Sequence, residues 1–117
     1  MSYADGFVLA VPEANIAAYK KLSTKAGKIW MEYGALSYVE CVADDVPVGK
    51  ITSFPRSVKL KEGEVVVFSW ITYKSRAHRD AVLKKVMADP RLQADMKNMP
   101  FDTKRMIYGG FKVLLEF

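Results

Sequence analysis

The sequence predicts an α+β fold with the ferredoxin-like order β-α-β-β-α-β, and three observations carry this prediction. Four segments are apolar and rich in β-forming residues. Two segments with a helical period separate the first strand from the second and the third from the fourth. The strands are apolar on both faces, so helices can cover only one side of the sheet. We therefore expect a single domain over residues 1–117 with a four-stranded antiparallel sheet, whose uncovered face pairs with a second copy of the chain.

The first strand and the first helix are marked by clear boundaries. Residues 3–11 are apolar and small, and Pro12 ends this strand and is suited to the start of a helix. Glu13 places a negative charge in the first turn, where it suits the helix dipole. The helix is predicted over 13–33, and Gly34 is a natural residue to end it. Its apolar stripe consists of Ile16, Tyr19, Leu22, Ala26, Ile29, Trp30 and Tyr33.

The middle of the chain contains two strands and an irregular connection. Residues 35–43 form the second predicted strand, which carries Glu40 inside it, and a turn cluster follows over 44–49. Residues 50–60 contain Pro55 and are predicted as a loop or an edge strand. After a tight turn, residues 65–73 give the strongest strand pattern in the chain.

The last third repeats the order of a helix followed by a strand. Ser75 is a good N-cap for a helix over 76–88, and Pro90 can open a short further helix that extends to about Lys97. The last strand is predicted over 106–115. Its Gly109-Gly110 pair indicates a bulge or a close approach of another part of the chain.

Large apolar residues lie on both parities of these strands. One set contains Phe7, Leu9, Val65, Val67 and Ile71, and the other contains Val8, Val66, Phe68, Trp70, Ile107, Phe111 and Val113. The sequence does not decide which set faces the helices. Burying the remaining set contributes on the order of 10 kcal/mol, which is similar to the cost of association. The simplest way to bury this remaining set is a homodimer formed through the open sheet face.

Composition limits the classes of function. The net charge of +5 is mild and spread along the chain, so we expect solvated helix faces rather than a nucleic-acid surface. The third strand also lacks the glycine and the basic residue of an RRM motif. His78 and Cys41 are the only residues of their types, and we expect no metal site and no cofactor. The first residues show no signal pattern and no stretch spans a bilayer, so a cytoplasmic location without membrane contact is expected.

Two carboxylates inside apolar strands are the strongest candidates for chemistry. Asp5 and Glu40 are costly to bury unless they are paired, and Arg105, Arg56 and Lys112 are candidate partners. A buried structural pair is one interpretation, and a polar centre that lines a pocket is the other. For such a centre the candidate catalytic residues are Asp5, Glu40, Arg105 and Tyr108, and Trp70 is the candidate binding residue. A carboxylate would act as the base and Arg105 would hold an anionic group.

Short blocks in order along the whole chain resemble the YbaA-type family of small bacterial proteins, a domain of unknown function. The blocks are Asp5-Gly6-Phe7-Val8, Val11-Pro12, Asp44-Asp45-Val46-Pro47, Gly49-Lys50, Val67-Phe68-Ser69-Trp70-Ile71, Met87-Ala88-Asp89-Pro90-Arg91, Met99-Pro100-Phe101-Asp102 and Lys104-Arg105-Met106-Ile107-Tyr108-Gly109-Gly110-Phe111. The resemblance implies the dimeric α+β barrel shared with small monooxygenases, dismutating haem enzymes and isomerases. It implies no established activity and transfers no catalytic residue.

Three classes of function follow from these observations. The first is a homodimer that binds or transforms a small, partly apolar molecule between sheet and helices, with oxygenase- or isomerase-type chemistry by analogy of fold alone. The second is a module that binds nucleic acid or protein through its basic helix faces, and the third is a structural dimer without catalysis.

Overall fold

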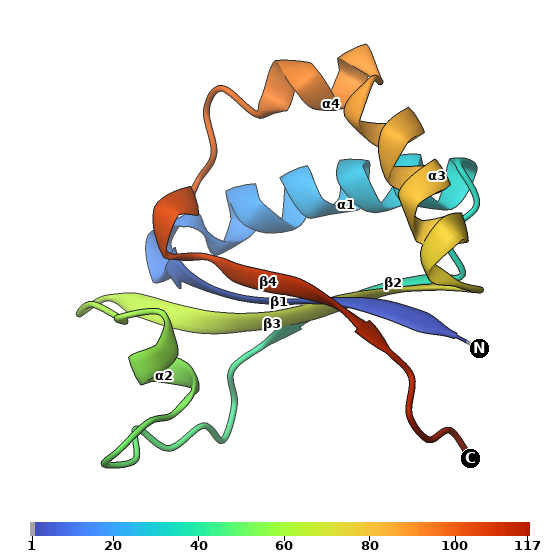
Figure 1. Cartoon of the computed structure of the whole chain (residues 1–117). Helices are drawn as coiled ribbons and strands as arrows, with labels where there is room; N and C mark the ends of the chain where they lie inside the picture. The colour runs from blue at the N-terminus through green and yellow to red at the C-terminus, as the bar shows by residue number, and fades with distance from the viewer. Residues whose placement is uncertain (1) are drawn as a thin grey trace.

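A computed structural model describes residues 2–117 and shows a four-stranded antiparallel sheet with one layer of helices (Figure 1). The strands are β1 (Tyr3–Pro12), β2 (Ser37–Val42), β3 (Glu64–Tyr73) and β4 (Ile107–Lys112), and their order in the sheet is β2-β3-β1-β4. The helices α1 (Ile16–Glu32), α3 (Arg76–Met87) and α4 (Pro90–Asp95) all lie on one face of the sheet. The predicted α+β class and the ferredoxin-like order are therefore confirmed.

Local signals place most of the helix boundaries. The Ser75 hydroxyl accepts a hydrogen bond from the His78 amide at the start of α3, and the Asp89 carboxylate accepts one from the Arg91 amide at the start of α4. Gly34 follows α1 with a φ of 106°, in the left-handed region that favours glycine. The first turn of the predicted helix is the separate 3₁₀ segment η1 (Glu13–Asn15).

Two boundaries differ from the sequence prediction. Residues 50–60 form no edge strand and instead contain the one-turn helix α2 (Phe54–Ser57), in which Pro55 occupies an early position. The last strand ends at Lys112 rather than Leu115, because β4 pairs with β1 only as far as Tyr3, where β1 begins. A second 3₁₀ segment, η2 (Thr103–Arg105), precedes β4.

The register of the sheet settles which face meets the helices. Asp5 lies opposite Ile71 and Gly110, and Leu9 lies opposite Val67, so these residues share one face. That face packs on α1, α3 and α4, with a core that contains Tyr3, Ala26, Ile29, Trp30, Ala35, Ile71, Tyr73, Val82, Val86 and Leu92. Val8, Phe68 and Trp70 belong to the other face, which we call the open face.

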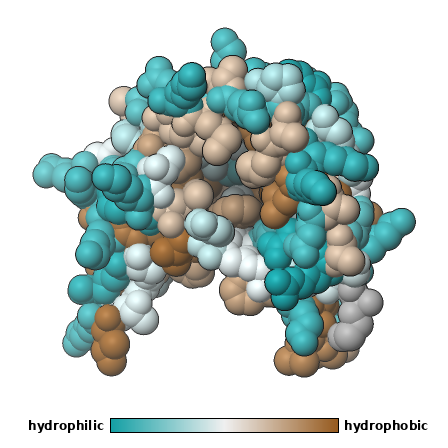
Figure 2. Space-filling model, turned by 45° about the horizontal axis from the view of Figure 1, so that its top comes forward, coloured by the Kyte–Doolittle hydropathy of each residue, from teal (hydrophilic) through white to brown (hydrophobic). Residues whose placement is uncertain are grey.

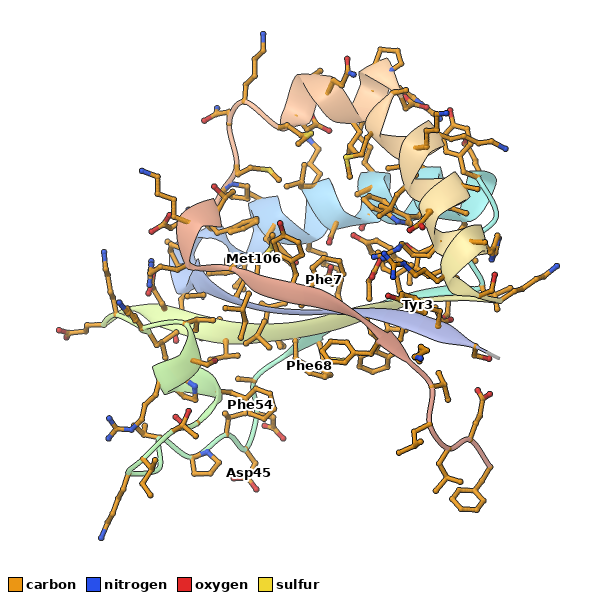
Figure 3. All side chains as sticks on the ribbon, in the orientation of Figure 1. Tyr3, Phe7, Asp45, Phe54, Phe68 and Met106 are labelled. Carbon is orange, nitrogen blue, oxygen red and sulfur yellow. The ribbon has the colours of Figure 1, made fainter. Side chains whose placement is uncertain are left out.

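The open face is covered by its own chain only at one end. We call residues 43–63, with α2, the loop arm. Val58 packs there on Ala10 and Val66, with Leu60 beside them. Phe54 lies against Phe68, on the side away from the helical layer, whereas Phe7 points toward α1 (Figure 3). Phe68 is 40% exposed and Phe111 is 64% exposed, so a large apolar surface stays in contact with water.

Candidate functional site

A groove between α1 and the edge strand β2 has a volume of about 990 Å³. The α1 side contributes apolar and polar side chains at a spacing of three and four residues. The β2 side contributes the helix-facing Tyr38, Glu40 and Val42 together with Cys41. The lining residues are Ile16, Tyr19, Lys20, Ser23, Thr24, Gly27, Lys28, Met31, Glu32, Tyr38, Glu40, Cys41, Val42 and Val67. The groove is therefore mostly apolar, with a few polar groups that meet within it.

The Glu40 carboxylate is the centre of these polar groups. The Tyr19 hydroxyl donates to Glu40 Oε2 at 2.6 Å, and the Ser23 hydroxyl donates to Oε1 at 2.9 Å. Tyr19 and Ser23 are four residues apart, so they lie on one face of α1. The Tyr38 hydroxyl lies 3.1 Å from Ser23 Oγ and extends the hydrogen-bond network along β2.

No cation within residues 2–117 forms an ion pair with Glu40. Hydroxyl groups alone satisfy this half-buried carboxylate in the structure. Burial and then the negative charge of Glu40 hold the pKa of Tyr19 far above its usual value. Burial also raises the pKa of Tyr38 to about 12. Both phenols therefore stay protonated near neutral pH and can act as hydrogen-bond donors.

Asp5, the other candidate carboxylate, lies away from the groove. Arg79 of α3 donates to Asp5 Oδ1 at 2.7 Å, and the same guanidinium lies 5.0 Å from the centre of the Tyr3 ring. The predicted partners Arg105, Arg56 and Lys112 are not the residues that pair with Asp5 or Glu40. Burial raises the pKa of the Asp5 carboxyl, and the charge of Arg79 partly opposes that rise.

The other predicted site residues are also apart from the groove. Arg105 forms a two-pronged ion pair with Glu64, at 2.6 and 2.8 Å, which lowers the pKa of Glu64. Tyr108 is 73% exposed on β4 and stacks on Phe7. Trp70 lies on the open face, 5.6 Å from the Phe68 ring. Of the predicted residues, the structure therefore places only Glu40 in the groove.

The hydroxyl partners of Glu40 are not among the residues that the sequence predicts for the site. Tyr19 belongs to the predicted apolar stripe of the helix, and Ser23 is not one of the residues of that stripe. The available signal was a serine on the buried side of an otherwise apolar stripe, four residues after a tyrosine. Lone His78 has a structural role, because its Nδ1 accepts a hydrogen bond from the Lys74 amide.

Neither a metal site nor a membrane segment appears in the part of the chain that the structure describes. Residues 2–117 contain no group of three or more His, Cys, Asp or Glu side chains placed to hold a metal ion. None of the helices in this range has the length and apolar character needed to cross a bilayer.

The family model for a protein of unknown function, DUF1428, matches residues 2–103. This chain is a member of the DUF1428 family. The uncharacterised protein YbaA of Escherichia coli K12 is 52% identical to it over 116 residues, which cover 99% of each chain. YbaA of Shigella flexneri shows the same identity and coverage. The predicted YbaA-type resemblance is thus confirmed.

Solved structures with little sequence identity share the fold of this DUF1428 member. Rv0793 from Mycobacterium tuberculosis superimposes with a TM-score of 0.61 at 15% identity, over 99% of this chain and 98% of the other. SnoaB from Streptomyces nogalater, a cofactor-independent oxygenase, gives 0.61 at 10% identity, over 98% and 95%. A dimeric ferredoxin-like protein from an uncultured marine organism gives 0.57 at 15% identity, over 99% and 98%.

Proposed function

We propose that this protein is a homodimeric α+β barrel that binds and transforms a small, partly apolar molecule in the groove between α1 and β2. The observation that carries the proposal is the Glu40 carboxylate, which lies in an apolar groove and is held by two hydroxyl donors without a cation. A carboxylate in such surroundings costs stability, and groups of this kind are concentrated at functional sites.

Glu40 is suited to accept a proton from a bound molecule. The Tyr19 and Ser23 hydroxyls each occupy one carboxylate oxygen and fix its orientation, and each oxygen keeps a further lone pair. A substrate with an acidic carbon–hydrogen or oxygen–hydrogen bond would lose its proton to Glu40. Return of that proton to another atom gives an isomerisation, and reaction of the anion with dioxygen gives an oxygenase reaction. The oxygenase SnoaB has the same fold, which supports the second route by analogy of fold alone.

A test of this chemistry uses 2-tetralone, a bicyclic ketone with an acidic carbon–hydrogen bond. We expect the protein to accelerate deuterium exchange at that carbon, measured by NMR in heavy water. We expect Glu40→Gln to reduce the acceleration about 100-fold, because the amide has the shape of the carboxylate but cannot accept the proton.

Two tryptophan variants locate the reaction in the groove. Thr24 lines the groove and is exposed, so Thr24→Trp fills the space and should also remove the acceleration. Ala18→Trp lies on the same helix outside the groove and should leave it unchanged. Equal acceleration by wild type and Glu40→Gln, or none by wild type, contradicts the assigned chemistry.

The open face supports the homodimer in the proposal. Phe54, Phe68 and Trp70 form a connected aromatic cluster there, with ring centroids 5.7 and 5.6 Å apart, and Ile107 and Phe111 add exposed apolar surface. The open face of a second copy is equally apolar, so two copies related by a twofold axis would cover each other's exposed surface. The dimeric marine ferredoxin-like protein, which has this fold, also supports such an assembly.

Phe68→Asp should convert the dimer to a monomer at micromolar concentration, because it places a charge at the centre of the apolar face. Light scattering after a sizing column measures the mass. Tyr108→Asp is the matched control, since Tyr108 is an exposed aromatic residue on the helix-facing side of β4 and should leave the dimer intact. A wild-type protein that stays monomeric at high concentration overturns the dimer.

A further inference from the structure

Two projections extend from the open-face side of the molecule at opposite ends (Figure 1). One is the loop arm, residues 43–63, and the other is the segment 113–117 after β4, which we call the tail. Figure 2 shows the two projections separated by a gap, with hydrophobic atoms near the end of each. The molecule is therefore concave on the side where the proposed partner would bind.

The tail is apolar but contacts little of its own chain. Leu114 is 93% exposed, Leu115 is 71% exposed and Phe117 is fully exposed. Within residues 2–117, two hydrogen bonds to Ser2 tie the tail to the body. The Val113 amide donates to the Ser2 carbonyl at 3.1 Å, and the Ser2 hydroxyl donates to Glu116 at 3.3 Å in an exposed hydrogen bond. Three large apolar side chains on five residues form a surface that is costly to leave in water.

The loop arm carries a surface that suits this tail. A hollow of about 390 Å³ is lined by apolar Val48, Pro55 and Leu60 and by the cations Arg56 and Lys59. Arg56 donates to the carbonyls of Val48 and Gly49, which holds the guanidinium at this hollow. Apolar walls with two positive charges are complementary to a segment that contains leucine, phenylalanine and Glu116.

The symmetry of a face-to-face pair decides which parts meet. One twofold axis parallel to the sheet brings each tail beside the loop arm of the other copy, so the projections fit past each other. A second possible twofold axis is also parallel to the sheet but perpendicular to the first axis. It sets tail against tail and loop arm against loop arm, and these identical projections would hold the two open faces apart. The first arrangement allows the apolar faces to touch.

From these observations we infer that the tail of each protomer docks on the loop arm of its partner, with its apolar side chains in the hollow and Glu116 near Arg56. This inference rests on the dimer in the proposed function and adds the segment that secures it. Five residues in extended form span roughly 17 Å, which is enough to reach from the edge of one sheet across a neighbouring surface.

Cysteine pairing tests this contact directly. In a Cys41→Ser background, one protein carries Leu115→Cys and another carries Val48→Cys, both at exposed positions that tolerate substitution. We expect the mixed and oxidised proteins to form a disulfide between chains in high yield. Leu115→Cys mixed with Met87→Cys, an exposed position on α3, should give little.

A charge exchange gives an independent measurement of the same contact. Glu116→Arg and Arg56→Glu should each raise the dimer dissociation constant severalfold, and the protein with both changes should recover most of the affinity. A disulfide yield no higher for Val48→Cys than for Met87→Cys overturns the docked tail while an intact dimer mass keeps the proposed function. A monomeric mass for the wild-type chain overturns both.

Discussion

Replacing Arg79 with methionine is expected to lower the free energy of unfolding by about 3 kcal/mol. The change removes the guanidinium that lies 2.7 Å from Asp5 Oδ1 and leaves that buried carboxylate without a cation. It also removes the cation above the Tyr3 ring. Methionine keeps most of the length of the side chain, so packing between α3 and the sheet changes little. Urea unfolding followed by circular dichroism measures the difference.

The loss of unfolding free energy in Arg79→Met should depend on pH, and it should be smaller in acid. Burial raises the pKa of Asp5 in the folded protein, and loss of Arg79 removes an effect that lowers it. A carboxyl with a raised folded pKa supports stability below its unfolded pKa, near 3.9, and loses that support as the pH rises through the folded value. The deficit of Arg79→Met should therefore be smaller near pH 4 than at pH 7.

Arg76→Met provides the control for this prediction. Arg76 is an exposed neighbour on α3 whose nitrogen lies 3.8 Å from Asp80, and such surface pairs contribute little. We expect its loss to change the free energy of unfolding by less than about 0.5 kcal/mol at either pH. Equal deficits for the two variants, or a deficit for Arg79→Met that grows at acidic pH, would contradict the assigned role of the buried pair.

Asp5 illustrates how far the sequence could identify a charged cluster. A carboxylate in an apolar strand indicates a partner, and that expectation is met. The identity of the partner depends on which strand face meets the helices and on the rotation of α3 above the sheet. Both parities of the strands are apolar, so the sequence does not decide which face meets the helices. Arg79 is also 74 positions away from Asp5 along the chain. None of the predicted partners, which are Arg105, Arg56 and Lys112, therefore pairs with Asp5.

Glu40 illustrates the same limit with a different outcome. The sequence marked it as a polar group inside a strand, and the structure places it in the groove. Its donors come from α1, which precedes β2, so they belong to the nearest helix in the chain. A spacing of four residues between Tyr19 and Ser23 was available, but a tyrosine in an apolar stripe has the same pattern whether its hydroxyl is used or not.

The order of elements was predictable because it depends on periodicity and on strong turn residues, which are local. The ends of β4 and the shape of the loop arm depend on pairing partners and on packing against Val58, which are not local. The Gly109-Gly110 pair has a local signal in the sequence, but its role depends on distant parts of the chain. Its two interpretations were a bulge and a close approach, and the regular pairing of both residues with β1 favours the second.

Gly110→Ala is expected to lower the free energy of unfolding by about 2 kcal/mol, whereas Gly109→Ala should be nearly neutral. A Cβ on Gly110 would lie 2.8 Å from Tyr3 Cε2 and 2.9 Å from Cζ, so the buried ring would have to move. Movement of the ring disturbs its contact with the Arg79 guanidinium, which lies over the ring. A Cβ on Gly109 meets only Phe111, at 3.6 Å, which is an ordinary contact.

The two variants are adjacent on one strand and carry the same chemical change, so backbone entropy affects them alike. Thermal and urea unfolding of both then isolate the contact with Tyr3. Tyr3→Phe combined with Gly110→Ala should recover part of the loss, because the hydroxyl is among the atoms nearest to the new methyl group. If Gly109→Ala is as destabilising as Gly110→Ala, the glycine pair serves the flexibility of β4 and not the approach of Tyr3.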